Sequence, residues 1–121
     1  MPVYNNQLIN ETLQKAVSDT ASSFNADFFI YNGPISLEGC DFLMNLVRGI
    51  APKDRKQNVI LALTTHGGNP DDGFRVMQFL KRHYSKVRFY IFGLCKSAGT
   101  MMAVGADSIV MGDFGEFGPL D

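Results

Sequence analysis

Apolar residues follow two kinds of pattern along this chain, helical spacing and short continuous runs. Residues 8–20 have apolar positions at helical spacing, which predicts a leading amphipathic helix. Short runs rich in β-branched and aromatic residues predict four strands, at 27–31, 59–64, 87–92 and 108–111. Helical spacing returns between these strands, in residues 36–49, 70–84 and 98–106. A strand followed by a helix therefore recurs, and this order requires right-handed parallel crossovers.

The starts of two helices are marked by capping residues. Ser36 is expected to cap the helix that follows the first strand, and Asn69 the helix that begins at Pro70. The run Val59–Thr64 is apolar without alternation, which is typical of a strand covered by helices on both faces. We therefore predict an α/β fold with a mostly parallel sheet. One domain is expected over 1–121, with a leading helix in 1–22 and a strand and helix core in 27–121.

Composition excludes several classes of function. Eleven Lys and Arg residues against twelve Asp and Glu residues give a net charge of -1, which disfavours a nucleic-acid partner. Apolar runs are far shorter than the ~18 residues that a membrane span needs, and the N-terminus resembles no secretory signal, so we expect a cytoplasmic protein. Cys40 and Cys95 lack the spacing of a zinc site and indicate reduced thiols, and we expect no metal.

Two loops at the ends of predicted strands carry candidate chemistry. In the first, adjacent Gly67 and Gly68 allow backbone N–H groups to approach an anion or oxyanion, although a tight turn is the alternative. In the second, Ser97 precedes a helix and could expose its Oγ while the Ala98 N–H points at the group attacked. A simple helix cap is the alternative for this serine. A parallel crossover brings Gly68 and Ser97 to the same edge of the sheet.

The two loops belong to a longer pattern that resembles the Clp/crotonase superfamily. It consists of Thr65–Pro70, Lys96–Thr100, Ala106–Gly112 and Phe117–Asp121, preceded by the strand end Asn32–Ile35. The similarity is closest to the serine peptidase branch that contains signal peptide peptidase A and the serine dehydrogenase proteinases. The interval from the glycine pair to the serine also fits the Clp protease proteolytic subunit. This resemblance implies a ββα-superhelix, or spiral, fold, which we expect to be truncated at the C-terminus of this chain.

The resemblance also implies roles for individual residues. Ser97 matches the nucleophile, and Gly68 and Ala98 match the pair whose N–H groups form the oxyanion hole. Gly67 and Asn69 would lie beside an extended peptide substrate, with helix capping as the alternative for Asn69. The implied function is a serine endopeptidase of the Clp protease class. It would hydrolyse peptide bonds in peptides or proteins through an acyl-enzyme on Ser97, without a metal or organic cofactor.

The general base is the component that the sequence does not identify. In the Clp branch a histidine follows the nucleophile by a further strand, and in the signal peptide peptidase branch a lysine serves. Of the residues present, His66 is the candidate, with local hydrogen bonding as its alternative. His83 lies among cationic residues at a helix end, Lys96 adjoins the serine on a diverging turn, and Cys95 fits a buried thiol better than a nucleophile.

Two other functions stay open, a crotonase-like acyl-CoA enzyme and a non-catalytic or degenerate member that binds peptides or partners. We also expect a homo-oligomer, because apolar residues exceed what a four-stranded sheet can cover. The residues behind this expectation are Leu37, Leu43, Met44, Phe74, Met77 and Phe79.

A Gly68→Val substitution is expected to reduce activity while leaving folding largely intact.

Overall fold

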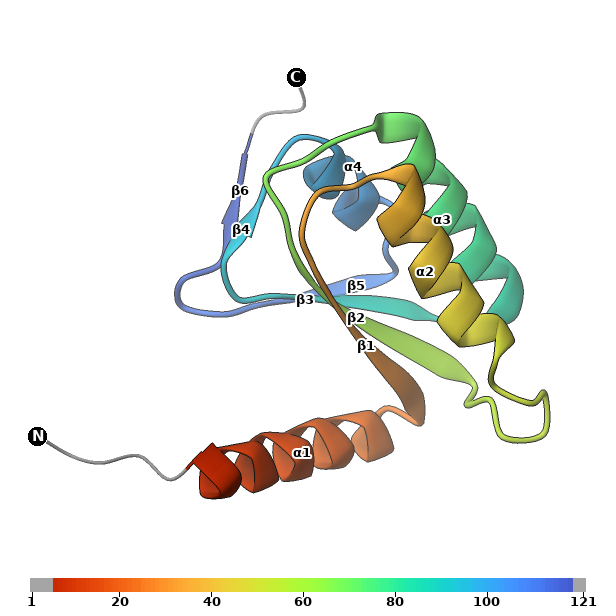
Figure 1. Cartoon of the computed structure of the whole chain (residues 1–121), viewed down its shortest axis with the longest axis vertical. Helices are drawn as coiled ribbons and strands as arrows, with labels where there is room; N and C mark the ends of the chain where they lie inside the picture. Colours follow the sequence, from red (N-terminus) through yellow and green to blue (C-terminus); the bar gives the residue numbers. More distant parts are fainter. Residues whose placement is uncertain (1–5, 119–121) are drawn as a thin grey trace, which may run out of the picture.

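The computed structural model describes residues 6–118 and contains one parallel four-stranded sheet (Figure 1). Its strands, in spatial order, are β1 (Ala26–Asn32), β2 (Asn58–Thr64), β3 (Val87–Ile91) and β5 (Ser108–Met111). The helices are α1 (Asn6–Ser23), α2 (Leu37–Arg48), α3 (Pro70–His83) and α4 (Ala98–Val104). Helix α1 precedes β1, and the other three connect successive strands of the sheet. The predicted order of elements and the parallel sheet are confirmed.

A second, smaller sheet lies at the C-terminal ends of these strands. Strand β4 (Leu94–Cys95) pairs in parallel with β6 (Glu116–Phe117), and isolated bridges join Thr65 to Cys95 and Ile35 to Gly68. The sequence analysis predicted no strand in residues 93–97. Two-residue strands carry no periodic signal, so this layer becomes visible only when the chain segments meet.

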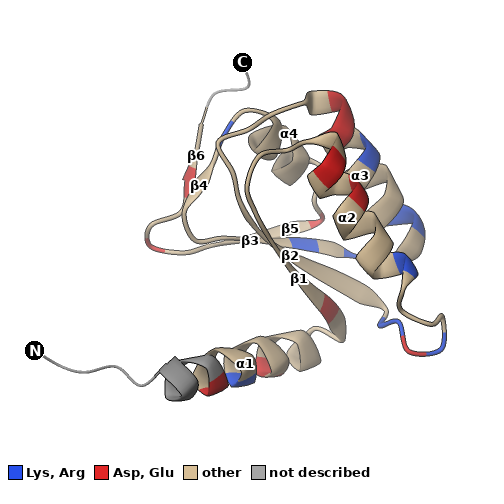
Figure 2. Cartoon of the chain, viewed as in Figure 1, with Lys and Arg blue, Asp and Glu red and all other residues tan. Residues whose placement is uncertain are grey.

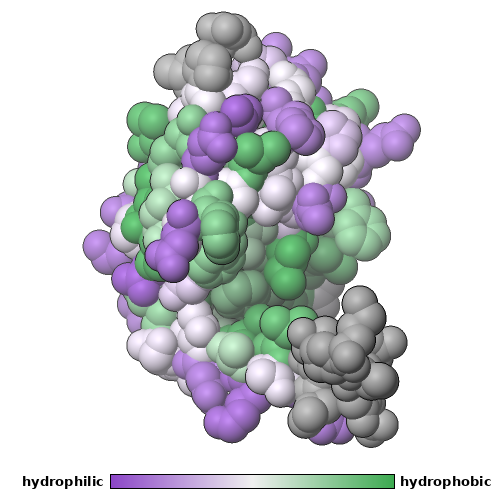
Figure 3. All heavy atoms as spheres, turned by 90° about the vertical axis from the view of Figure 1, so that its left-hand side faces the viewer, coloured by the Kyte–Doolittle hydropathy of each residue, from purple (hydrophilic) through white to green (hydrophobic). Residues whose placement is uncertain are grey.

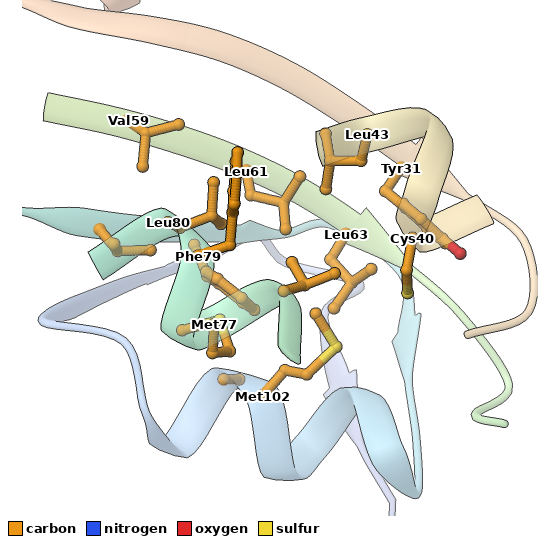
Figure 4. Packing of buried hydrophobic residues seen from close by; sticks show 14 of the residues in the cluster. Tyr31, Cys40, Leu43, Val59, Leu61, Leu63, Met77, Phe79, Leu80 and Met102 are labelled. Carbon is orange, nitrogen blue, oxygen red and sulfur yellow. The ribbon is translucent and has the colours of Figure 1, made fainter. Parts of the chain in front are cut away.

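One face of the main sheet forms the hydrophobic core. The rows across this face join β1, β2 and β3 in register, as in Phe29–Leu61–Phe89. Figure 4 shows Val59, Leu61 and Leu63 on one side of β2, facing helix α3. Leu61 and Phe89 are fully buried, and α2 and α3 cover them with residues such as Val47 and Leu80. Side chains alternate between the faces of a strand, so every second residue of β2 enters this core.

The opposite face of the sheet is largely uncovered within residues 6–118. One row across it consists of Ile30, Ala62, Tyr90 and Val110, of which Ile30 is 71% exposed. Figure 3 looks onto this side of the molecule, where apolar side chains gather in a hollow. The expectation that β2 is covered by helices on both faces is therefore wrong for the described residues. Ile60 is buried on this face because Phe28 and Arg88 flank it in the next row.

The helix caps predicted from the sequence are present, and charged residues lie at the ends of the same helices. The Ser36 side chain accepts a hydrogen bond from the Gly39 N–H, and the Asn69 side chain accepts from Asp71 and Asp72. Acidic residues lie at the starts of α2 and α3 and basic residues at their ends (Figure 2). This distribution complements the helix dipoles, which favour negative charge at the N-terminus and positive charge at the C-terminus.

The residues that suggested self-association are mostly not on the surface. Leu43, Met44, Met77 and Phe79 are buried in the core, because α2 and α3 use these residues to cover the sheet. Leu37 and Phe74 remain exposed, and further exposed apolar side chains lie on the open sheet face and on α1, whose Leu13 is 59% exposed. No helix in residues 6–118 is long and apolar enough to cross a membrane. The homo-oligomer stays a prediction, and the open sheet face is a second apolar surface that supports it.

We expect Ile30→Lys to weaken self-association of the protein, because it places a charge on the exposed apolar face. Light scattering coupled to gel filtration measures the mass at micromolar concentration. Val104→Lys is the matched control, since Val104 is 75% exposed but lies on α4. A wild-type protein of monomer mass would contradict the prediction.

We expect Tyr84→Phe to lower the free energy of unfolding by about 1 kcal/mol. The Tyr84 hydroxyl donates a 2.8 Å hydrogen bond to Asp27 Oδ2, which ties the end of α3 to β1. Burial, followed by this bond, raises the pKa of Tyr84 above its ordinary value of 10.0. The stabilisation is therefore present below about pH 10 and is lost as the pH rises further.

Urea unfolding of the wild type and the variant at pH 7, and again above pH 10, measures this difference. The difference should narrow at the higher pH. Tyr90→Phe serves as the control, because the Tyr90 hydroxyl has no hydrogen bond among the described residues. Equal stability of the wild type and Tyr84→Phe at pH 7 would refute the assignment.

Candidate active site

The two candidate loops meet because the pairing of β2 and β3 continues past the end of the main sheet. The Thr65 N–H donates to the Leu94 carbonyl at 2.9 Å, and the Lys96 N–H donates to the Thr65 carbonyl at 3.0 Å. These bonds join the residues just before the glycine pair to the residues just before Ser97. The sequence expectation that a parallel crossover brings the loops to one edge is confirmed by this bridge.

Gly67 and Gly68 both adopt conformations that side chains rarely allow. Their φ angles are 117° and 148°. A Cβ at Gly67 would lie 2.6 Å from Ser97 Cβ and 3.1 Å from Ser97 Oγ. A Cβ at Gly68 would overlap the backbone of Ile35. Glycine is thus required twice, once for contact with Ser97 and once for contact with the segment that follows β1.

The peptide group between Gly67 and Gly68 has a defined orientation. The Gly67 carbonyl accepts a hydrogen bond from the Ile35 N–H at 2.9 Å. In a trans peptide the N–H points opposite to the C=O, so the Gly68 N–H is directed away from Ile35. Among the described residues, neither the Gly68 N–H nor the Ala98 N–H has a hydrogen-bond acceptor. These two N–H groups are the candidate oxyanion donors.

Ser97 has the backbone of a strained strand-to-helix turn. Its φ and ψ are 54° and −119°, and its side chain makes no capping hydrogen bond to α4 although it occupies the N-cap position. This observation counts against the simple helix cap. A conformation of this kind costs about 1–3 kcal/mol and persists only where the surroundings enforce it. Ser97 is partly exposed.

The start of α4 is held against the rest of the site by two further residues. The Thr100 hydroxyl lies 2.8 Å from the Cys95 carbonyl and 3.0 Å from the Gly118 carbonyl. A Cβ at Gly99 would overlap the methyl group of Thr65, so α4 approaches the end of β2 only because residue 99 is glycine. These contacts enforce the turn at Ser97.

The other predicted site residues have different surroundings. Asn69 caps α3 through its side-chain oxygen, with distances of 2.8 Å to Asp71 N and 3.3 Å to Asp72 N, as in the alternative considered for it. His66 is exposed on the loop between β2 and the glycine pair. It lines a pocket of about 190 Å³ together with Asn32, Thr64 and Leu94.

The remaining candidates for a base are engaged elsewhere. Lys96 forms a 3.1 Å salt bridge with Glu116, and its carbon chain packs over Gly118. His83 Nδ1 lies 2.8 Å from the Phe79 carbonyl at the far end of α3. Within residues 6–118, no three His, Cys, Asp or Glu residues cluster in a way that could hold a metal ion.

The expectation for Gly68→Val needs correction. A side chain at residue 68 would overlap the Ile35 backbone, and the φ of 148° is itself unfavourable for valine. The substitution would therefore disturb the fold of the loop as well as its N–H. A loss of activity in this variant would therefore not show that the Gly68 N–H is an oxyanion donor.

Sequence analysis included Ile35, Thr65 and Gly99 in the family pattern but gave them no role in the site. Ile35 orients the glycine loop through its backbone, which leaves no mark in a sequence. Gly99 lies in the first turn of the helix that begins after Ser97. A glycine at this position could have indicated that the helix approaches a strand closely. Thr65 is a buried polar residue, at 3% exposure, directly before the glycine loop.

The comparisons with known proteins concern the sequence and fold of the chain. No family model matches the chain. An uncharacterised protein of Methanocaldococcus jannaschii is 30% identical over 87 residues, which are 72% of this chain and 29% of that protein. The catalytic domain of the ClpP protease from Plasmodium falciparum superposes with a TM-score of 0.60 at 11% identity, covering 91% of this chain and 62% of the other.

Two structures of the 1510-N membrane-bound stomatin-specific protease are also similar. One, a lysine-to-alanine mutant in complex with a substrate peptide, has a TM-score of 0.61 at 26% identity and covers 71% of this chain and 40% of the other. A serine-to-alanine mutant has a TM-score of 0.61 at 25% identity, with 71% and 42% covered. The chain thus spans less than two thirds of the length of each of these relatives. The resemblance to serine peptidases of the ClpP/crotonase superfamily and the ClpP/crotonase-like fold are confirmed.

We expect Cys95 to resist thiol reagents in the folded protein. Cys95 is fully buried beneath the Ser97 turn, and burial raises the pKa of its thiol to about 11. At pH 8 about one thiol in a thousand would then be ionised. Titration with Ellman's reagent should detect neither Cys95 nor the equally buried Cys40 until the protein is denatured. Ser97→Cys provides a control thiol that is expected to react in the folded state, and rapid modification of Cys95 without denaturation would contradict its assignment as a structural thiol.

Proposed function

We propose that this chain, with its ClpP/crotonase-like fold, carries the nucleophile and oxyanion hole of a serine endopeptidase. The observation that carries the proposal is the contact of Ser97 with Gly67, next to two backbone N–H groups that have no acceptor within residues 6–118. A nucleophile and oxyanion donors at one position are the minimum that acyl transfer from a peptide bond requires.

In the proposed reaction, Ser97 Oγ attacks the carbonyl carbon of the scissile peptide bond as its proton passes to a base. The carbonyl π electrons move to the oxygen, and the Gly68 and Ala98 N–H groups stabilise the resulting oxyanion. Collapse of this intermediate breaks the C–N bond, and the amine leaves with a proton. Water then hydrolyses the acyl-enzyme and regenerates the Ser97 hydroxyl.

The base is assigned to a residue outside the described part of the chain. Lys96 is held by Glu116 and His83 lies at the far end of α3, so neither supports this role. His66, exposed on the loop before the glycine pair, is the alternative among the described residues. The substrate class is a peptide or protein, supported by the substrate peptide bound to the stomatin-specific protease.

The strained conformation of Ser97 also distinguishes the proposal from its alternatives. An acyl-CoA enzyme of the crotonase kind needs the oxyanion donors but has no use for a nucleophile in a strained turn. A peptide-binding protein without activity needs neither feature. Strain at a residue that makes no capping bond is typical of a catalytic position.

A fluorophosphonate probe tests the proposed function, because it labels only activated serines. In the protein expressed from its whole gene, we expect stoichiometric labelling at Ser97 and none in Ser97→Ala. In Ser97→Ala, the rate at which unstructured protein substrates are hydrolysed should likewise fall to the background rate. The melting temperature should change little, because Ser97 is partly exposed and its hydroxyl does not cap α4.

Ser85→Ala is the matched control. Ser85 is an exposed serine that follows α3 and has no activating surroundings, so we expect this variant to take up the probe at Ser97 as the wild type does. Mass spectrometry of the labelled peptide identifies the site. Equal turnover by the wild type and Ser97→Ala would refute the nucleophile. A folded wild type that binds peptides but takes up no probe would favour the non-catalytic alternative.

A further inference from the structure

Thr65 is a buried polar residue at the junction of the two loops. Within residues 6–118 it is one of three polar or charged residues that are buried, the others being Asn58 on β2 and Asp72 on α3. We propose that Thr65 is a positioning residue that holds the Gly67–Gly68 peptide in the orientation an oxyanion hole needs. This inference rests on the proposed peptidase function.

The Thr65 hydroxyl contacts both peptide groups of Gly67. Its Oγ1 accepts a hydrogen bond from the Gly67 N–H at 3.0 Å and lies 3.3 Å from the Gly67 carbonyl oxygen, to which it donates. One hydroxyl therefore binds on both sides of a glycine whose φ is 117°. Without this hydroxyl, the buried Gly67 N–H has lost its acceptor, and the backbone gains freedom to rotate.

The orientation of this peptide decides whether the Gly68 N–H is available to substrate. If the Gly67–Gly68 peptide turns over, its carbonyl oxygen replaces the N–H and presents negative charge to the oxyanion. Glycine on both sides makes such rotation easier than at any other residue pair. The Ile35 N–H opposes it from one side at 2.9 Å, and the Thr65 hydroxyl opposes it from the other.

The methyl group of Thr65 serves the second loop. It occupies the position that a Cβ at Gly99 would need, so it lies directly against the first turn of α4. The backbone of Thr65 is bonded to Leu94 and Lys96 as well. A single residue thus contacts the oxyanion loop through its hydroxyl and the nucleophile's helix through its methyl group.

These two contacts are separable by substitution. Thr65→Val keeps the shape and the methyl contact but removes the hydroxyl. Thr65→Ser keeps the hydroxyl and removes the methyl group. If Thr65 acts by orienting the peptide, Val should be defective and Ser should retain most of the function, whereas a residue that only fills space should show the opposite order.

The test uses the protein expressed from its whole gene and two readouts. The first is saturation kinetics of fluorophosphonate labelling at Ser97. Loss of one oxyanion donor typically costs about 10²–10³ in rate, so we expect the maximal labelling rate of Thr65→Val to fall by about 10- to 100-fold, with half-saturation unchanged. Thr65→Ser should label within a few-fold of the wild type.

The second readout is amide hydrogen exchange of Gly67, measured by NMR, which needs no activity. Exchange should be slow in the wild type and in Thr65→Ser and fast in Thr65→Val, while amides of β2 and β3 stay protected in all three. Wild-type labelling kinetics in Thr65→Val, or unchanged Gly67 exchange, would overturn the proposal. A wild type that takes up no probe overturns the peptidase function instead, and Gly67 exchange then decides alone whether Thr65 holds the loop.

Discussion

The candidate site depends on one pair of backbone hydrogen bonds, those of Thr65 with Leu94 and Lys96. They extend the parallel pairing of β2 and β3 beyond the main sheet, where the strands would otherwise diverge into separate loops. The glycine pair follows Thr65 by two residues, and Ser97 directly follows Lys96. A short parallel bridge therefore determines that a serine and a glycine loop, some thirty residues apart in the chain, are in contact.

Close approach of backbones is the second requirement, and glycine supplies it on each side. Gly67 allows the loop to touch Ser97, Gly68 allows it to touch Ile35, and Gly99 allows α4 to approach Thr65. Gly73 serves the same purpose one layer away, where a Cβ would lie 2.9 Å from Met102 Cγ and would push α3 from α4. A larger residue at any of these glycine positions would push the contacting segments apart.

The strain at Ser97 is consistent with this construction. A residue in an unfavourable backbone conformation keeps it only when its neighbours are themselves constrained. Here the preceding residue is bonded to Thr65, and Thr100 is bonded to the carbonyl of Cys95. The covered face of the sheet provides the rigid support, while its open face takes no part in the site.

Local signals in the sequence determined the helices, the strands and the order in which they alternate. The Asn69 cap, the apolar run of β2 and the recurring strand and helix pattern were sufficient for the parallel sheet, because each depends on neighbouring residues. The two site loops were found for the same reason, since Gly67, Gly68 and Ser97 stand at strand ends.

Only the tertiary structure decided which face of the sheet is covered, which apolar residues of α2 and α3 are buried, and how β4 and β6 pair. It alone gave Gly68 an essential contact with Ile35 and made Thr65 a neighbour of both loops. These properties depend on contacts between residues distant in the chain, and spacing along a sequence contains no information about the distance between two backbones in space.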